Sequence, residues 1–229
     1  MGECDLVLVS AAAFDLDIHI RTTSRYQYSF IETAVIRIGE NTLEVSSHGE
    51  YAFDAISAAN LTSPNAKLGQ YPIYHSQPSE KRHVFDIVLG PHQNITLSTF
   101  KDLVSVKITE GTRDVFGDSV GLMGSFKGEL LARDGSPLSL EADGADVIGQ
   151  EWQVRESEPM LFRTARAPFA GEKCILPSAE TKQRRLGEAK VTRIDAERAC
   201  GLLSGQSFDN CVVDVMEVGD LDLAQAGAY

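Results

Sequence analysis

Two aspartates separated by one residue, Asp15 and Asp17, have the spacing in this chain that most directly suggests chemistry. Alternate residues of a β-strand point to the same side, roughly 6.5–7 Å apart, so two such carboxylates can share a metal ion that also holds a nucleotide sugar. The same pair also fits the solvent-facing side of an amphipathic strand. Because no phosphate-binding glycine loop accompanies Asp15-Leu16-Asp17, the second interpretation is favoured.

The other residue types that carry chemistry form no catalytic pattern. None of the five histidines has the i, i+4 spacing of a helical metal-binding pair; they are His19, His48, His75, His83 and His92. Ser125 follows a glycine but lacks the second glycine of a nucleophile turn. The sequence therefore predicts a protein that is not an enzyme.

Acidic residues within a glycine-rich stretch form the best candidate cation site. Calcium takes several oxygen ligands from a flexible loop, and such a loop is available between Asp118 and Asp146. Glu129 and Asp134 are the residues we expect to contribute most. The alternative is ordinary turn chemistry, in which an aspartate beside a glycine caps the turn.

Four cysteines occur in the chain, at Cys4, Cys174, Cys200 and Cys211. An even number at wide spacing fits two disulfides in an oxidising compartment about as well as four free thiols in a reducing one. Two glycosylation sequons, at Asn60 and Asn94, favour the oxidising alternative.

Composition narrows the classes of partner. A net charge of −12 argues against binding to nucleic acid, because few basic groups are available to neutralise phosphates. No stretch is long and apolar enough to span a bilayer, so no transmembrane segment is expected. With 229 residues, 43% of them hydrophobic, the chain can bury one domain core and carry an appendage.

A period of two in hydrophobicity predicts β-strands over most of residues 5–108. Apolar and polar residues alternate between Phe14 and Arg21, and strands are also expected at 30–38, 43–45, 83–89 and 95–108. Residues 60–78 contain prolines and serines and are interpreted as a loop. Frequent glycines after Gly111 predict short strands joined by tight turns.

Residues 164–177 are expected to form a linker, and 178–229 a helical module. Helices are predicted from Ser178, from Asp195 to near Gly205, and from Asp209 to near Gly219. A disulfide between Cys200 and Cys211 would join the last two helices across their turn. Such a small unit needs a crosslink, since burial alone would not hold it together.

Three segments together resemble a von Willebrand factor type D domain. They are the apolar strand after Gly2-Glu3-Cys4, the glycine loop 121–128, and the Trp152 segment 149–154. The Cys200–Cys211 region resembles the cysteine-bearing helical module that often follows this domain. The sequence of residues 17–22 most resembles that of the divergent type D-like domains of microalgal surface proteins.

The resemblance implies a mainly β, antiparallel, sandwich-like domain over 1–163, and Cys4 pairing with Cys174. The family's first strand is missing, so we expect an N-terminally incomplete domain with an open sheet edge. The family's calcium ligands in the glycine loop are replaced by residues that include Ser125 and Lys127.

The expected function is that of a non-catalytic extracellular or cell-surface module for adhesion, matrix assembly or protein–protein interaction. Its partners would be other extracellular proteins or glycans, with self-association included. The alternative is a carbohydrate-binding lectin or carbohydrate-active enzyme that uses Asp15 and Asp17. An intracellular β-sandwich of unassigned role is a third alternative.

Overall fold

The protein is mainly β and consists of two compact units. A computed structural model describes residues 2–25, 28–53, 56–57, 66–175 and 191–225. The chain divides into a larger unit, Met1–Pro177, and a smaller one, Ser178–Tyr229. The larger unit holds every strand, and each unit is described separately below.

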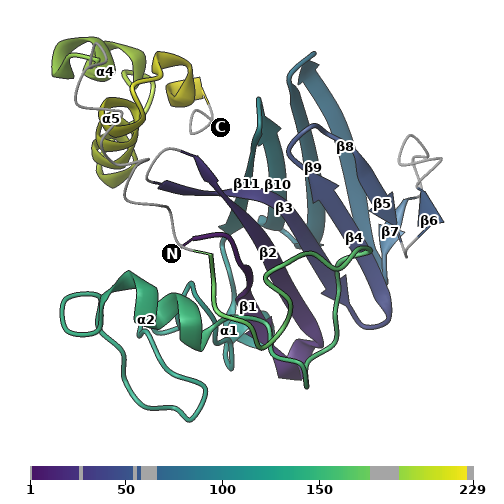
Figure 1. Cartoon of the computed structure of the whole chain (residues 1–229). Coiled ribbons are helices and arrows are strands. Elements are labelled where there is room, and N and C mark those ends of the chain that lie inside the picture. Colours follow the sequence, from purple (N-terminus) through teal and green to yellow (C-terminus); the bar gives the residue numbers. More distant parts are fainter. Residues whose placement is uncertain (1, 26–27, 54–55, 58–65, 176–190, 226–229) are drawn as a thin grey trace. The chain divides into compact units, whose positions relative to one another are not determined.

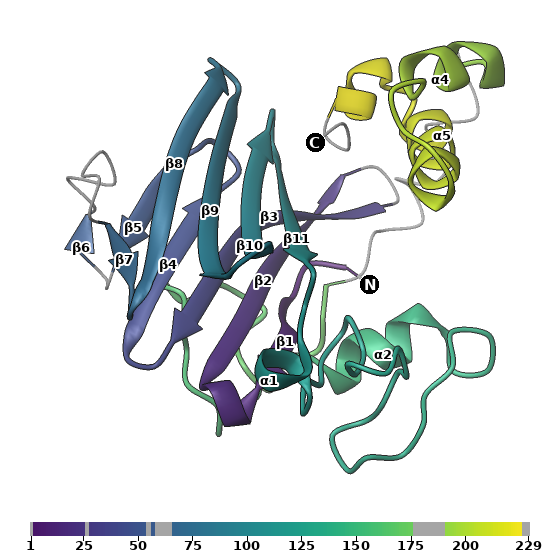
Figure 2. The same cartoon turned by 180° about the vertical axis from the view of Figure 1, so that it is seen from behind.

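Two antiparallel sheets form the larger unit, which we call the β unit (Figures 1 and 2). The first sheet has six strands in chain order: β1 (Asp5–Ala11), β2 (Leu16–Arg25), β3 (Tyr28–Ile38), β4 (Asn41–Ser46), β5 (Tyr51–Phe53) and β6 (Ile56–Ser57). The second has five, in the order β11 (Leu103–Thr109), β10 (Gln93–Phe100), β9 (Arg82–Gly90), β8 (Tyr71–Ser79) and β7 (Lys67–Leu68). The predicted antiparallel, sandwich-like architecture is confirmed.

The alternation predicted around Asp17 divides strand β2 between two environments. Leu16, Ile18 and Ile20 are buried in the core, where they join residues of the second sheet such as Phe85 and Leu97. The intervening residues lie on the opposite face, which we call the outer face of the first sheet. Phe14 belongs to the short 3-10 helix η1 (Ala12–Phe14), so the strand begins two residues later than expected.

Residues 66–78 were predicted as part of a loop, and this was wrong. They include β7 and most of β8, whereas residues 60–65 lie outside the described residues. Strand β7 pairs with only the first two residues of β8, so the rest of β8 has a free edge among the described strands. A proline is tolerated at such an edge because no ladder hydrogen bond needs its missing N–H.

The glycine-rich region contains helices where short strands were expected. These are α1 (Arg113–Phe116) and α2 (Gly144–Glu151), and Trp152 follows α2 directly as its C-terminal cap. The extended pairing here consists of isolated bridges such as Leu6 with Gln153 and Ser10 with Val120. The Trp152 segment 149–154, which resembles part of the type D domain, is thus the end of helix α2, and Gln153 joins it to β1 by a bridge.

The outer edge of β1 is hydrogen-bonded along its length, so the expectation of an open edge was wrong. Val7 N donates to Trp152 O at 2.7 Å, and Val154 N donates to Asp5 O at 2.9 Å. Further along, Ser10 and Val120 exchange two backbone hydrogen bonds of 2.8 and 2.9 Å. Segments from the glycine-rich region therefore occupy the position of a neighbouring strand.

Residues 155–175 lie against the outer face of the first sheet, and we call them the strap. In Figure 1 this green segment crosses the sheet on the side away from the second sheet. Arg163 N donates to Glu44 at 2.8 Å, and Arg166 pairs with Glu32. The predicted linker, 164–177, is therefore part of the β unit up to the last described residue, Ile175. Polar and charged contacts hold the strap, and the linker prediction did not account for them.

The smaller unit is helical, as predicted. It contains α4 (Arg193–Ala199), α5 (Gln206–Val218) and the 3-10 helix η3 (Leu221–Gln225). Thr192 caps α4 by accepting a hydrogen bond from Asp195 N, and α5 ends at Gly219 in the left-handed region. Buried residues from all three helices form its core: Ala196, Cys200, Val212, Val215 and Ala224. The helix predicted from Ser178 lies outside the described residues.

Candidate functional site

Both predicted disulfides are formed. Cys4 and Cys174 have Cα atoms 5.1 Å apart, and this bond joins the start of β1 to the end of the strap. Cys200 and Cys211 have Cα atoms 6.0 Å apart and connect α4 with α5. Each unit therefore carries its own crosslink, which is the oxidised alternative of the two that the cysteine spacing left open.

Asp15 and Asp17 both bind the same arginine. Arg37 Nη1 lies 2.7 Å from an Asp15 oxygen, and Arg37 Nη2 pairs with Asp17. Asp15 itself ends helix η1 with φ of 51°, so its carboxylate is aimed by a left-handed backbone turn. The two carboxylates converge on a guanidinium, and because Asp15 precedes β2, the spacing of alternate strand residues is not what brings them together.

Glu129 and Asp134 lie in exposed turns of the glycine-rich region. Asp134 accepts hydrogen bonds from Ser136 N and Ser136 Oγ, at 2.9 and 2.6 Å, and the hydroxyl bond above all lowers the pKa of Asp134. Glu129 N donates to Ser125 Oγ at 3.3 Å. Among the described residues, no group of three or more His, Cys, Asp and Glu side chains is placed to hold a metal ion. Calcium binding stays a prediction.

The two sequons differ in what the structure describes. Asn60 lies outside the described residues. Asn94 is half-buried on β10, and because its neighbour Ile95 is in the core, Asn94 faces away from it. That side of the second sheet is turned toward the viewer in Figure 2. Glycosylation at either position stays a prediction.

His19 is the most deeply buried ionisable side chain on the outer face of the first sheet. It is 3% exposed, and its Nδ1 atom has no hydrogen-bond partner among the described residues. Burial lowers the pKa of His19, although the nearby carboxylates of Asp17, Glu158 and Asp5 oppose this. The imidazole is therefore neutral at neutral pH, with one ring nitrogen unsatisfied. A buried polar atom of this kind calls for a partner.

Arg133 organises the polar network beside His19. Its guanidinium carbon lies 4.8 Å from the centre of the Trp152 ring, and its side chain pairs with Glu158. Arg133 Nε and Nη2 also donate to the carbonyls of Glu151 and Gln153, at 2.8 and 3.0 Å. A planar, multidentate group is required at this position, because a lysine ammonium cannot make all these contacts at once.

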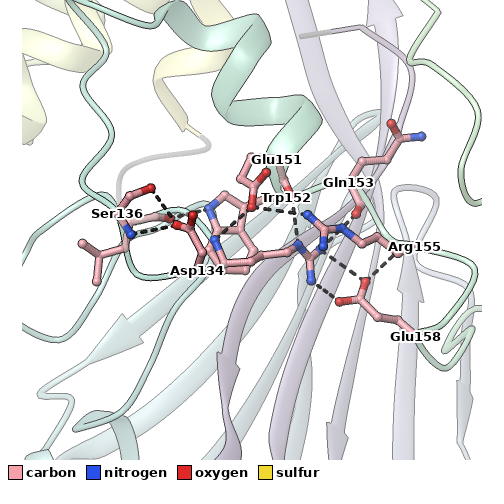
Figure 3. Close-up of polar contacts among 9 residues, drawn as sticks. Asp134, Ser136, Glu151, Trp152, Gln153, Arg155 and Glu158 are labelled. Carbon is pink, nitrogen blue, oxygen red and sulfur yellow. Dashed lines mark hydrogen bonds and ion pairs between the residues drawn. The ribbon is translucent and has the colours of Figure 1, made fainter.

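Further hydrogen bonds of this network fix Glu158 and Trp152 (Figure 3). Glu158 also accepts a hydrogen bond from Arg155 N at 2.9 Å, which Figure 3 shows as a dashed line. Trp152 Nε1 donates to Leu131 O at 3.0 Å, and the side chain is 2% exposed. The carboxylate of Glu158 is therefore preorganised by two different donors before any ligand arrives.

A hollow of about 350 Å³ opens between β1, β2, the glycine-rich region and the strap. Its polar lining combines the unsatisfied imidazole with hydroxyl, carboxylate and guanidinium groups, and its apolar lining comes from valine, proline and the tryptophan. The lining residues are Val7, Ser10, Asp17, His19, Val120, Arg133, Trp152, Glu158 and Pro159. Its size is at the lower end of small-molecule sites.

The sequence singled out only Asp17 from this hollow as a site residue. Asp17 and His19 were both placed on the polar face of one strand. Glu158 and Pro159 of the strap were assigned to the β domain 1–163, but no pattern predicted that they return over this strand. Arg133 and Glu158 are 25 residues apart and carried no motif. An arginine shortly before the only tryptophan was the one available signal, and it is a weak one.

The fold and the network together define a disulfide-linked antiparallel β unit with a small polar hollow, accompanied by a disulfide-linked helical module. No protein-family model matches the chain, and no curated protein is similar to it. Among the described residues, no helix is long and apolar enough to cross a membrane.

Proposed function

We propose that this protein is a non-catalytic extracellular or cell-surface module that takes part in adhesion or matrix assembly, as a divergent relative of the type D domain. The Cys4–Cys174 bond is the observation that carries the proposal. It closes a loop whose ends are separated by 170 residues and fixes the strap over the first sheet. Crosslinks of this kind persist in oxidising compartments, which include the cell surface.

The state of the ionisable groups supports binding in preference to turnover. Arg37 pairs with both Asp15 and Asp17, so neither carboxylate is free to hold a metal with a nucleotide sugar. Glu158 and Arg133 neutralise each other in the same way. Groups fixed in ion pairs position a partner well but are poor proton donors and acceptors. The partners proposed are other extracellular proteins or glycans.

The compartment is tested by the state of the thiols. Protein freshly isolated from its native source is alkylated before and after reduction and mapped by peptide mass spectrometry. We expect linked peptides for Cys4–Cys174 and Cys200–Cys211, with alkylation only after reduction. Four cysteines alkylated without reduction would refute an extracellular location.

Adhesion is tested with beads that carry the full chain at one end. Coated beads are washed over native cell surfaces or matrix and over one another, and the retained fraction is counted. Retention above that of beads coated with reduced and alkylated protein is the expected result. Equal retention by both preparations would contradict the proposal.

A further inference from the structure

The hollow beside His19 is lined by both polar and apolar side chains, and we consider it as a binding site. The buried imidazole of His19, whose Nδ1 has no partner among the described residues, lies in the wall of a hollow large enough for a small ligand. An unsatisfied buried nitrogen costs free energy unless a ligand or an ordered water completes it. The question is which ligand chemistry the rest of the lining selects.

Every carboxylate and guanidinium that lines the hollow already has an opposite charge. Asp17 pairs with Arg37, and Glu158 pairs with Arg133. The His19 imidazole is neutral at neutral pH, because burial lowers its pKa. An anionic ligand would meet no unpaired cation and would lose its hydration without compensation. Arg37 is shared by Asp15 and Asp17, but Asp15, the second carboxylate, does not line the hollow, so a cationic ligand gains little there as well. The lining therefore favours a ligand with no net charge.

The paired groups keep free hydrogen-bonding positions. A carboxylate has about four acceptor positions, and the ion pairs leave some of those of Asp17 and Glu158 unused. Arg133 keeps one of its five N–H donors, because the other four go to the carbonyls of Glu151 and Gln153 and to both oxygens of Glu158. Ser10 adds a hydroxyl, which both donates and accepts. A ligand group that can both donate and accept hydrogen bonds suits this mixture of donors and acceptors, and a hydroxyl is such a group.

The remaining walls are apolar. Val7, Val120 and Pro159 contribute carbon surface to the same hollow. A pyranose ring carries hydroxyl groups around its rim and C–H groups on its faces, which matches polar groups and carbon surface in one small volume. A single ring fits within about 350 Å³.

We propose that this hollow binds one neutral pyranose residue of a glycan, with Ser10, Asp17 and Glu158 as its hydrogen-bonding partners and the His19 ring in its wall. The inference rests on the proposed function, because it assigns one class of partner to the extracellular module. The site binds the sugar without cleaving it, since both carboxylates remain in their ion pairs.

Nuclear magnetic resonance of the full chain tests the proposal. Glucose, galactose, mannose and N-acetylglucosamine are titrated separately while the ring nitrogens of His19 are followed. At least one sugar is expected to shift them saturably, with a Kd on the order of 1 mM for a ligand of this size. Gluconate and glucosamine, which carry a charge, are expected to leave them unchanged.

Two variants locate the binding. Glu158→Gln is expected to weaken it about tenfold, because one charged hydrogen-bond acceptor is lost. Glu32→Gln is the matched control, since Glu32 is likewise a carboxylate paired with an arginine, Arg166, but does not line the hollow. Equal affinities in the two variants would overturn the assignment, provided that both retain the circular dichroism of the parent.

The failures of the two proposals are distinguishable. If no neutral sugar shifts His19 in protein with both disulfides intact, the sugar site is refuted and the extracellular module stands. If only the charged sugars bind, the sugar site is also refuted. Four free thiols would refute the extracellular module whatever the hollow binds.

Discussion

Gly121 lies against the backbone of Leu8, so closely that a Cβ atom on Gly121 would fall 2.5 Å from the Leu8 carbonyl oxygen. The φ angle of Gly121 is +136°, in a region that favours glycine. Its neighbours use this approach, because Leu122 N donates to Val7 O and Met123 N donates to Leu8 O, each at 3.1 Å. The contact lets a loop occupy the edge of β1.

Gly121→Ala is therefore expected to lower the free energy of unfolding of the β unit by about 3 kcal/mol or more. Gly128→Ala is the control: Gly128 has a φ of +81° but no atom within 4 Å of a Cβ, so only the backbone cost of about 1–2 kcal/mol applies. Urea unfolding followed by the fluorescence of Trp152, the only tryptophan, measures both. Similar values for the two variants would mean that the edge contact is unimportant.

Arg133→Lys is expected to destabilise the β unit by about 2–4 kcal/mol despite keeping the charge, because the carbonyl bonds, the contact with Trp152 and the two-pronged Glu158 pair cannot all be retained. Unfolding in urea provides the value. Arg155→Lys serves as control in the same unit, since the Arg155 side chain makes a largely exposed pair with Glu151 at 3.3 Å. A loss for Arg133→Lys no larger than for the control would contradict the role of the guanidinium plane.

Removal of the two disulfides is expected to have unequal effects. By the loop-closure relation, the bond that spans 170 residues is worth about 5 kcal/mol and the bond that spans 11 about 3 kcal/mol. The Cys4→Ala/Cys174→Ala double variant should lower the Trp152 unfolding midpoint strongly. The Cys200→Ala/Cys211→Ala variant should leave that midpoint unchanged, because its bond lies in the other unit. A shift of the midpoint by the second variant would show that the two units unfold together.

Acidification is expected to weaken the β unit through His19. The pKa of His19 in the fold is below the ordinary value of about 6.5, so above that pH the imidazole is neutral in both the folded and unfolded states. As the pH falls below about 6.5, the unfolded chain binds the proton first, and the free energy of unfolding drops by at most about 1.4 kcal/mol per pH unit until the folded pKa is reached. His75, whose pKa burial and His83 lower, acts in the same direction.

The contribution of His19 is isolated by comparing the parent with His19→Gln in urea titrations at several values of pH between 7.5 and 5. The variant should show a smaller drop than the parent. A drop of the same size in both proteins would assign the pH dependence to other groups.

Asn94 is expected to carry an N-glycan when the chain is secreted from a glycosylating eukaryotic cell, because it faces outward from β10 within an Asn-Ile-Thr sequence. Intact-mass and peptide mass spectrometry, before and after enzymatic deglycosylation, checks this. Asn94→Gln should remove that glycan and leave the two disulfides unchanged. Secreted protein with unmodified Asn94 would show the sequon to be unused.

Local patterns predicted the strands whose two faces differ. Leu16, Ile18 and Ile20 alternate with polar residues because one side of β2 meets the core. Strand β8 was missed because, along its free edge, exposed residues such as Tyr74 and Ser76 leave little alternation to detect. Helix α2 has only eight residues, two of which are Gly144 and Gly149, too few for a helical period to stand out.

Contacts between residues far apart in the sequence could not be predicted from the spacing of residues alone. The pairing of Cys4 with Cys174 came from the family resemblance, since the positions of four cysteines allow three connectivities. The hollow could not be predicted at all, because it exists only where the strap returns over β2. His19 belongs to the polar set of an alternating strand, which predicts exposure. It is buried because residues far along the chain, including Glu158 and Pro159, line the same space.

The bond between Cys4 and Cys174 turns nearly the whole β unit into a covalent ring. A protease that cuts an exposed turn of this ring, such as the one around Asp134, would release no fragment, and the nicked protein would separate into two pieces only after reduction. A protein exposed to extracellular proteases would in this way survive a first cleavage as a single molecule.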